Sequence, residues 1–162
     1  MDEEPIPRRG ARVLVVDRDG QVLLLRGSDP ARPEGPTWWF TPGGGVDAGE
    51  DDAEAARREL LEETGHRAGD LGDPVWRRVV EFPFLGRRYR QSEVFFLLEV
   101  DRFAVDTGGH SAIEREAVLG HRWWPLADLA ASAETVYPSS LAAGLATLLR
   151  DGRPESPVEV AP

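Results

Sequence analysis

A run without glycine or proline, Glu50–Thr64, is the feature that most constrains the fold of this chain. It consists largely of Ala, Leu, Glu and Arg, which favour helix, and it ends at Gly65, a residue type that commonly terminates helices. Before it stands Pro42-Gly43-Gly44-Gly45, which we expect to be irregular. The sequence therefore predicts a long helix that follows a glycine-rich turn.

Short apolar and aromatic runs on both sides of this helix predict strands. Before it lie Ala11–Val16 and Gln21–Leu25, joined by a turn that contains Asp-Gly, and then Trp38–Thr41. After it we expect three further strands and two helices: Val75–Phe84, Tyr89–Val100, His121–Trp124, Pro125–Ala131 and Ser139–Arg150. This order predicts an α/β fold with a mixed β-sheet sandwiched between helices.

The length of 162 residues fits one domain, which we expect to span residues 10–151. Residues 1–9 and 152–162 are rich in charge and proline, and we expect loosely ordered tails there. The polar segment 101–120 is predicted to be a long functional loop.

Composition excludes several classes of function. The formal net charge of −10 disfavours binding to a nucleic-acid backbone, and it suits a protein that collects divalent cations. No apolar run approaches the roughly 18 residues of a membrane span, so we expect no membrane partner and no secretion signal. The chain has no cysteine, which excludes disulfides, thiol catalysis and thiolate metal sites and fits a cytoplasmic location.

Three carboxylates share one side of the predicted helix. At about 100° per residue, Glu59, Glu62 and Glu63 fall within an arc of roughly 100°. Small apolar residues on an adjoining side, Ala53, Ala56 and Leu60, would dock the helix. Mg²⁺ prefers oxygen ligands, often carboxylates together with substrate phosphates. The alternative is a solvated acidic face on which Arg58 pairs with Glu62.

The flanking residues favour the metal site. Gly44, Glu50, Arg58-Glu59-Leu60, Glu62-Glu63 and Gly65 all stand in register with one motif, so the segment from Gly44 to His66 resembles the box of the Nudix hydrolase (MutT-like) family. His66 departs from it, because the family has an aliphatic residue there, at a position that packs rather than ligates. The order of predicted strands and helices is also similar to that of the Nudix fold.

This resemblance implies a Mg²⁺-dependent hydrolase, with Mn²⁺ as a substitute, that cleaves the diphosphate linkage of a nucleoside diphosphate derivative. Glu59, Glu62 and Glu63 and the backbone carbonyl of Gly43 would bind the metal. Glu50 and Arg58 would pair and brace the loop against the helix. Nucleoside triphosphates, oxidised nucleotides, ADP-ribose, nucleotide sugars and dinucleoside polyphosphates all stay open as substrates.

The general base varies within the family, and the sequence leaves several candidates. Glu63 lies in the box, and Glu62 stands beside it among the predicted catalytic residues. Glu114 and Glu116 lie in the segment 101–120, and Glu93 is a weaker contender on a strand. We favour Glu116, because a mobile loop could close over the substrate and bring a free carboxylate to the attacking water.

Aromatic and arginine residues give the candidate substrate contacts. We expect Trp39 and Phe40, just before the glycines, and Tyr89 and Arg90 to stack on a base or hold a phosphate, with Gly44 allowing close approach. Neighbours on a strand alternate faces, so one face of the Trp-Trp-Phe run would be core and the other would line a pocket. The three histidines show no metal-ligand or triad spacing, which indicates structural roles.

Two other functions compete with this one. An isopentenyl-diphosphate isomerase-like activity uses a cysteine, and this chain has none. A catalytically silent module that senses a nucleotide or binds a partner commonly lacks box carboxylates, whereas this chain has all of them. The expected partner is a small nucleotide substrate; the oligomeric state stays open, with a homodimer as one option.

Overall fold

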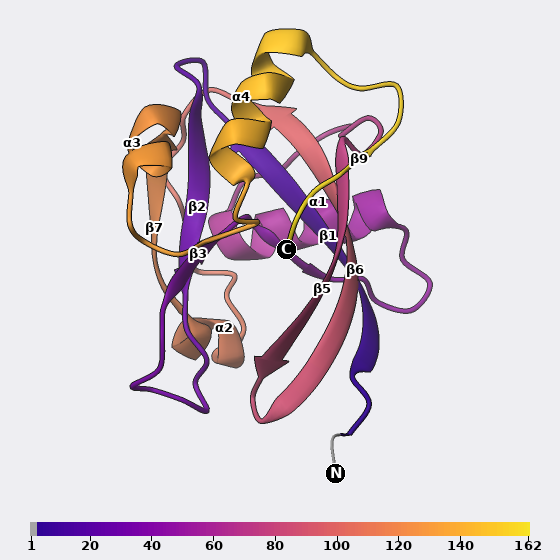
Figure 1. Cartoon of the computed structure of the whole chain (residues 1–162), viewed down its shortest axis with the longest axis vertical. Coiled ribbons are helices and arrows are strands. Elements are labelled where there is room, and N and C mark those ends of the chain that lie inside the picture. Colours follow the sequence, from indigo (N-terminus) through magenta and orange to yellow (C-terminus); the bar gives the residue numbers. More distant parts are fainter. Residues whose placement is uncertain (1–2) are drawn as a thin grey trace.

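The computed structural model describes residues 3–162, and within them nine strands form one mixed sheet (Figure 1). The sheet order is β8-β3-β2-β1-β6-β5-β9, with β4 paired to β1 and β7 paired to β2. The strands are β1 (Ile6–Val16), β2 (Gln21–Gly27), β3 (Trp38–Phe40), β4 (Gly43–Gly45), β5 (Trp76–Phe84), β6 (Arg87–Glu99), β7 (Val118–Pro125), β8 (Val136–Tyr137) and β9 (Val158–Glu159). The helices are α1 (Asp52–Thr64), α2 (Ala112–Ala117), α3 (Leu126–Ala131) and α4 (Leu141–Asp151).

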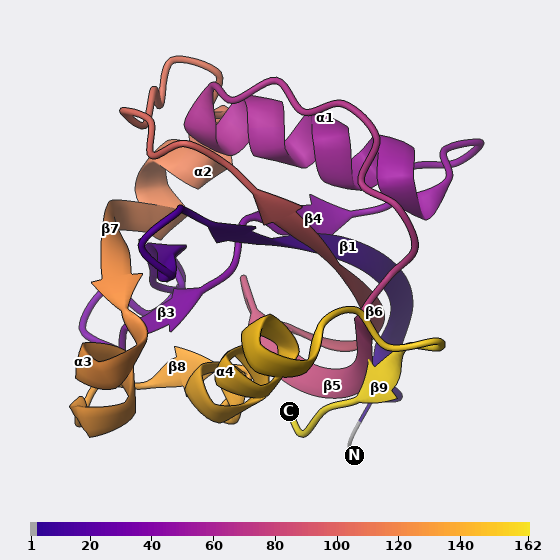
Figure 2. The ribbon, with the colours of Figure 1, turned by 90° about the horizontal axis from the view of Figure 1, so that it is seen from above.

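The two faces of β1 divide the hydrophobic core. Val13 and Val15 belong to the cluster that contains Leu60 of α1, whereas Leu14 and Val16 belong to the cluster that contains Leu145 of α4. Helix α1 therefore covers one face of the sheet, and α3 and α4 lie on the other (Figure 2). This arrangement confirms the predicted α/β fold with a mixed sheet between helices. None of the helices in residues 3–162 combines the length and the apolar character that a bilayer crossing requires.

The predicted turn between the first two strands is confirmed. One oxygen of Asp17 accepts the backbone N–H groups of Asp19 and Gln21, each at 2.9 Å. Beyond the pair Val16–Val22 the two strands diverge: residues 10–12 of β1 pair with β4, and β2 pairs with β3 and β7. On its other edge β1 runs parallel to β6 along its whole length. That parallel pairing follows the crossover through α1.

The glycine-rich segment is more regular than expected. We predicted Pro42–Gly45 to be irregular, but Gly43–Gly45 form β4, antiparallel to residues 10–12 of β1. Gly43 has a φ of 142°, and a Cβ there would lie 2.3 Å from the carbonyl oxygen of Ala11. A strand in this position therefore requires glycine, which propensity alone does not reveal.

Secondary structure also extends into both segments for which loose order was expected. β1 begins at Ile6, which pairs with Tyr89, and Val158 of β9 pairs with Trp76. Partner strands satisfy the backbone groups of these charged, proline-rich segments. Residues 1–2 of the expected N-terminal tail lie outside the described residues.

Segment 101–120 is not loop throughout, because α2 lies within it. The Ser111 hydroxyl accepts the N–H of Glu114, and the Glu114 carboxylate accepts the N–H of Ser111. This reciprocal capping box satisfies donors at the start of a short helix. The segment ends in β7, which starts at Val118, three residues before the predicted strand.

Candidate active site

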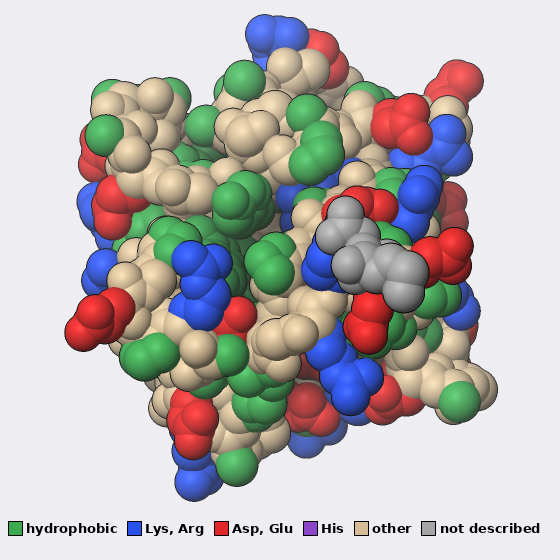
Figure 3. Space-filling model, turned by 60° about the horizontal axis from the view of Figure 1, so that its bottom comes forward, with side chains coloured by type: hydrophobic (Ala, Val, Ile, Leu, Met, Phe, Trp, Pro, Cys, Tyr) green, Lys and Arg blue, Asp and Glu red, His purple; other side chains and the backbone are tan. Residues whose placement is uncertain are grey.

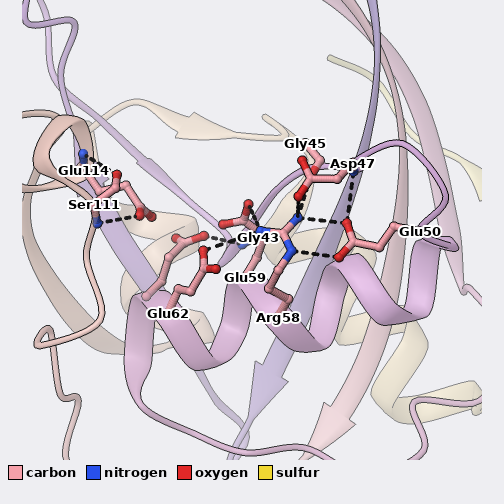
Figure 4. A network of polar contacts seen from close by, with 10 residues as sticks. Gly43, Gly45, Asp47, Glu50, Arg58, Glu59, Glu62, Ser111 and Glu114 are labelled. Carbon is pink, nitrogen blue, oxygen red and sulfur yellow. Dashed lines mark hydrogen bonds and ion pairs between the residues drawn. The ribbon is translucent and has the colours of Figure 1, made fainter.

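Helix α1 begins and ends where its sequence allows. The Asp51 side chain accepts the N–H of Glu54 at 2.8 Å, and Gly65 adopts a left-handed φ of 77° and donates its N–H to Leu61. Ala56 and Leu60 are buried against the sheet, as predicted. The helix therefore carries its glutamates along the side that faces β4 and α2 (Figure 4).

Arg58 joins the loop before α1 to the helix itself. Its Nε and Nη2 donate to both oxygens of Glu50 at 2.7 and 2.9 Å, and Nη2 also donates to the carbonyl of Gly45 at 3.0 Å. The hydrogen bonds from Arg58, together with the backbone N–H of Asp47, hold the pKa of Glu50 at about 2. Nη1 additionally reaches Glu59 and Glu62, at 3.0 and 3.4 Å. The structure thus contains the predicted Glu50–Arg58 pair and also the Arg58–Glu62 pair of the alternative interpretation.

Glu63 is buried between α1 and β4. Its side chain accepts the N–H of Gly43 at 3.2 Å. Burial and the neighbouring Glu59 carboxylate raise the pKa of Glu63 well above its usual range, although Arg12 opposes this shift. Within the described residues, the positive charge of Arg12 therefore does not fully offset the cost of ionising this buried carboxyl group.

The register of β4 explains why Gly43 faces Glu63. Backbone bonds join Val13 to Pro42 and Arg9 to Val46, so Gly43 occupies a position between them at which the ladder forms no bond to β1. Its N–H therefore points away from β1 and donates to Glu63 of α1. Gly44 lies close to Glu59, because a Cβ on Gly44 would lie 2.7 Å from the Glu59 carboxylate.

Three carboxylates converge beside these glycines. Oxygens of Glu59, Glu63 and Glu114 all lie within 4.8 Å of one another. Glu62 stands at the border, and burial and Glu59 raise its pKa. Clustered carboxylates repel one another, and a buried one is costly unless paired. Oxygen donors in this arrangement, next to a backbone carbonyl, fit a hard divalent cation.

The two glutamates of α2 differ in where they point. Glu114 turns back through its bond to Ser111 and reaches the box carboxylates (Figure 4). Glu116, in contrast, is exposed. The structure therefore brings Glu114, not the favoured Glu116, to the site. The reason is that the capping box holds the Glu114 side chain, whereas Glu116, about 200° further around the helix, lies on an exposed side.

The two predicted aromatic contacts separate, as alternation on a strand requires. Trp39 is buried in the core, with its ring centroid 5.4 Å from that of Trp124, and its Nε1 donates to Glu134. Phe40 is half-buried on the other face, under the guanidinium of Arg12 at 5.8 Å. Trp39 is thus placed in the core rather than at a pocket.

The remaining predicted contacts lie on the β5–β6 hairpin. Tyr89 stacks on Phe82 at 5.6 Å between centroids and lies beneath Arg8, and the exposed Arg90 faces Glu81. The structure pairs both with groups other than the box. Figure 3 views the end of the molecule where this hairpin and α2 lie, and there hydrophobic side chains surround a hollow that arginine and acidic side chains border.

Sequence reasoning missed two groups near the site. Arg12 extends from β1 and ion-pairs with the fully buried Glu93. His110 is buried, and its ring nitrogen lies 2.9 Å from the carbonyl oxygen of Glu63. Neither residue has a spacing signal, because strand pairing and the loop after β6 bring them to α1. The Ser111-x-x-Glu114 pattern, in contrast, is a capping-box signature that could have placed Glu114.

Comparison with known proteins gives a consistent match. A family model of the NUDIX domain matches residues 6–143. An RNA pyrophosphohydrolase from Bartonella bacilliformis is 41% identical over 75 residues, covering 44% of each protein. A putative 8-oxo-dGTP diphosphatase from Bacillus subtilis is 45% identical over 60 residues, covering 37% of this chain and 36% of that protein. The matches thus span less than half the length of these curated relatives.

Solved structures show the same fold. The crystal structure of a MutT protein from Methanosarcina mazei Go1 superposes with a TM-score of 0.61. It covers 93% of this chain and 98% of its own, at 21% identity. At that identity the likeness concerns the fold.

Proposed function

We propose, since the chain belongs to the NUDIX domain family, that it is a divalent-metal-dependent hydrolase that cleaves the diphosphate linkage of a nucleoside diphosphate derivative. The convergence of the Glu59, Glu63 and Glu114 carboxylates beside the backbone of Gly43 and Gly44 carries this proposal. Glu59 and Glu63 supply carboxylate oxygens of the kind that Mg²⁺ binds together with phosphate groups, and Glu114 lies beside them.

Glu59, Glu63 and the Gly43 carbonyl would hold Mg²⁺, or Mn²⁺ in its place, with Glu62 at the border of the cluster. When bound, the cation neutralises charge on the phosphates and lowers the pKa of a bound water. Arg58 and Glu50 position these ligands, because the same guanidinium bonds Glu50, the Gly45 carbonyl and Glu59. These hydrogen bonds connect α1 to β4 and to the loop that precedes the helix.

We assign the general base to Glu114 in place of Glu116. One Glu114 oxygen accepts the N–H of Ser111, which orients the carboxylate while its position among the box glutamates keeps it beside the reacting groups. It would take the proton of the water that attacks phosphorus. Glu116 is exposed and has no ion pair among the described residues.

The names of the relatives and the charge of the chain support the choice of substrate class. The matched relatives are named for hydrolysis of RNA pyrophosphate groups and of 8-oxo-dGTP. A net charge of −10 disfavours a long nucleic-acid backbone, which supports a free nucleotide as the substrate.

A substrate panel tests this function. It contains 8-oxo-dGTP, ADP-ribose, a nucleotide sugar, a dinucleoside tetraphosphate and a 5′-triphosphorylated RNA, each incubated with the full chain and Mg²⁺ or Mn²⁺. Chromatography of the products identifies the bond that is cleaved. We expect metal-dependent release of a nucleoside monophosphate, or of pyrophosphate, from at least one free nucleotide. No release from any of them, with either metal, would leave a nucleotide-sensing module instead.

A further inference from the structure

A buried ionic cluster joins strands β1, β5 and β6. The Glu93 carboxylate is fully buried on β6 and accepts hydrogen bonds from Arg12 of β1, Arg78 of β5 and Gln91 of its own strand. Glu93 pairs with Arg78 across the antiparallel strands, and Arg12 pairs with Phe95 across the parallel ones. The three charged side chains are therefore brought together by strand register.

The cluster holds two arginine side chains against the single carboxylate of Glu93. Arg78 keeps a buried Nη1 without a partner among the described residues. A single arginine would neutralise Glu93, and buried ion pairs bring little net stability over apolar side chains. The surplus positive charge is costly unless an anion accompanies it.

The guanidinium of Arg12 lies beside the segment that leads into the box. Its Nη1 donates to the carbonyl of Thr41 at 3.1 Å, two residues before Gly43, and its guanidinium lies over Phe40. Burial opposes its charged form, but Glu93, Glu63 and Glu59 together raise the pKa of Arg12. Two of the guanidinium nitrogens are thus engaged with Glu93 and the backbone, and the group stands at the border of the carboxylate cluster.

We infer that Arg12 binds a phosphate group of the substrate and that Glu93 is a positioning residue that holds Arg12 in place. A guanidinium fork matches phosphate oxygens, and a fixed fork loses little entropy when it binds them. The inference rests on the proposed function for the identity of the ligand, a diphosphate. It assigns the recognition of phosphate to β1 and β6, outside the Gly44–Gly65 box.

Binding of methylenediphosphonate, a diphosphate that hydrolysis does not cleave, tests the inference without reference to catalysis. Calorimetry with the full chain and Mg²⁺ compares wild type with Arg12→Met and with a matched control, Arg77→Met, whose exposed arginine neighbours Arg78. We expect Arg12→Met to weaken binding about tenfold or more, since charge-assisted hydrogen bonds are lost. Arg77→Met should bind as wild type. Mg²⁺ alone should bind Arg12→Met at least as tightly as wild type, because the variant lacks a cation beside Glu63 and Glu59, so a loss of probe binding cannot come from a loss of metal.

A double-mutant cycle tests the positioning role. Glu93→Gln should weaken binding of the probe in the wild-type background and have little further effect in the Arg12→Met background, because Arg12 is the residue that Glu93 holds. A general structural role would weaken binding in both backgrounds. Circular dichroism checks that Glu93→Gln and Arg12→Met fold. If either does not, Glu93→Asp and Arg12→Lys replace them in the same comparison, because they keep the charges but displace them.

Wild-type affinity for the probe in folded Arg12→Met or Arg12→Lys would overturn the inference, as would a wild type that does not bind the probe. These results are separate from failure of the proposed function. A chain that hydrolyses no nucleotide but loses probe binding with Arg12 would keep the phosphate site and reject the enzyme.

Discussion

The Arg58 guanidinium donates hydrogen bonds to both oxygens of the Glu50 carboxylate, from Nε at 2.7 Å and from Nη2 at 2.9 Å. This pair joins the loop before α1 to the middle of the helix. Two parallel bonds between planar groups are stronger and more directional than a single surface ion pair. Because Arg58 also bonds Glu59 and the carbonyl of Gly45, this pair orients the side chain that we propose as a metal ligand.

The Glu50–Arg58 pair predicts a dependence of stability on pH. The pKa of Glu50 falls from 4.5 to about 2 on folding, so its contribution is fully present above pH 4.5 and is lost as the pH falls toward 2. Glu50→Gln should therefore lower the free energy of unfolding at pH 6, and the difference from wild type should shrink toward pH 2. Urea unfolding at several pH values measures it. The exposed Glu54→Gln on the same helix is the control, and a gap that persists unchanged at pH 2 would contradict the assignment.

Glu63 predicts opposite effects with and without metal. Its pKa is raised, so wild type loses stability as the pH rises from 4.5 toward the folded-state pKa. Glu63→Gln should therefore raise the midpoint of thermal unfolding in EDTA at pH 7, by about 2 °C or more. With millimolar Mg²⁺, wild type should gain stability and the variant should gain much less. A variant that is no more stable than wild type in EDTA would show that burial of the charge costs nothing.

Glu114 and Glu116 offer a matched pair for the identity of the base. Glu114→Gln should lower kcat by about 10²-fold or more, within the usual range for loss of a general base. The acidic limb of its pH–rate profile should also disappear. Glu116→Gln should leave both unchanged, because its side chain is exposed on the same short helix. The reverse pattern would return the role to Glu116 and require α2 to reorient in the complex.

Trp39 should behave as a core residue. Its ring packs on Trp124 and is buried, so Trp39→Ala should lower the free energy of unfolding by about 3–5 kcal/mol. Denaturant unfolding measures this loss, and Trp39→Phe, which keeps an aromatic ring, should lose less. A Trp39→Ala protein with wild-type stability and a raised KM would place the ring at the substrate instead.

The helix and its carboxylates could be predicted because their signals are local. The Gly65 stop and the spacing of Glu59 and Glu63 depend on helical geometry within one segment, whereas the Glu50–Arg58 pair is implied by the resemblance to the Nudix box. The α/β fold followed from the order of strands and helices, and it is confirmed.

Contacts between distant segments could not be predicted in this way. β1 pairs in parallel with β6, which brings Arg12 to Glu93 across 81 positions of sequence, and no periodicity within either strand records that pairing. β4 forms because glycine allows the chain to approach β1 closely, a steric fact that propensity hides. The expectation for Glu116 rested on treating residues 101–120 as loop, whereas the Ser111–Glu114 capping box begins a helix there.

The most direct test of the central claim is the rate of nucleotide hydrolysis as a function of Mg²⁺ concentration, in wild type and in Glu63→Gln. We expect wild type to be inactive in EDTA and to gain activity up to saturation as Mg²⁺ is added. Glu63→Gln should remain slower by about two orders of magnitude or more at saturating metal, since a ligand of the catalytic cation is lost. Hydrolysis that persists in EDTA, or a Glu63→Gln protein as fast as wild type, would contradict the account.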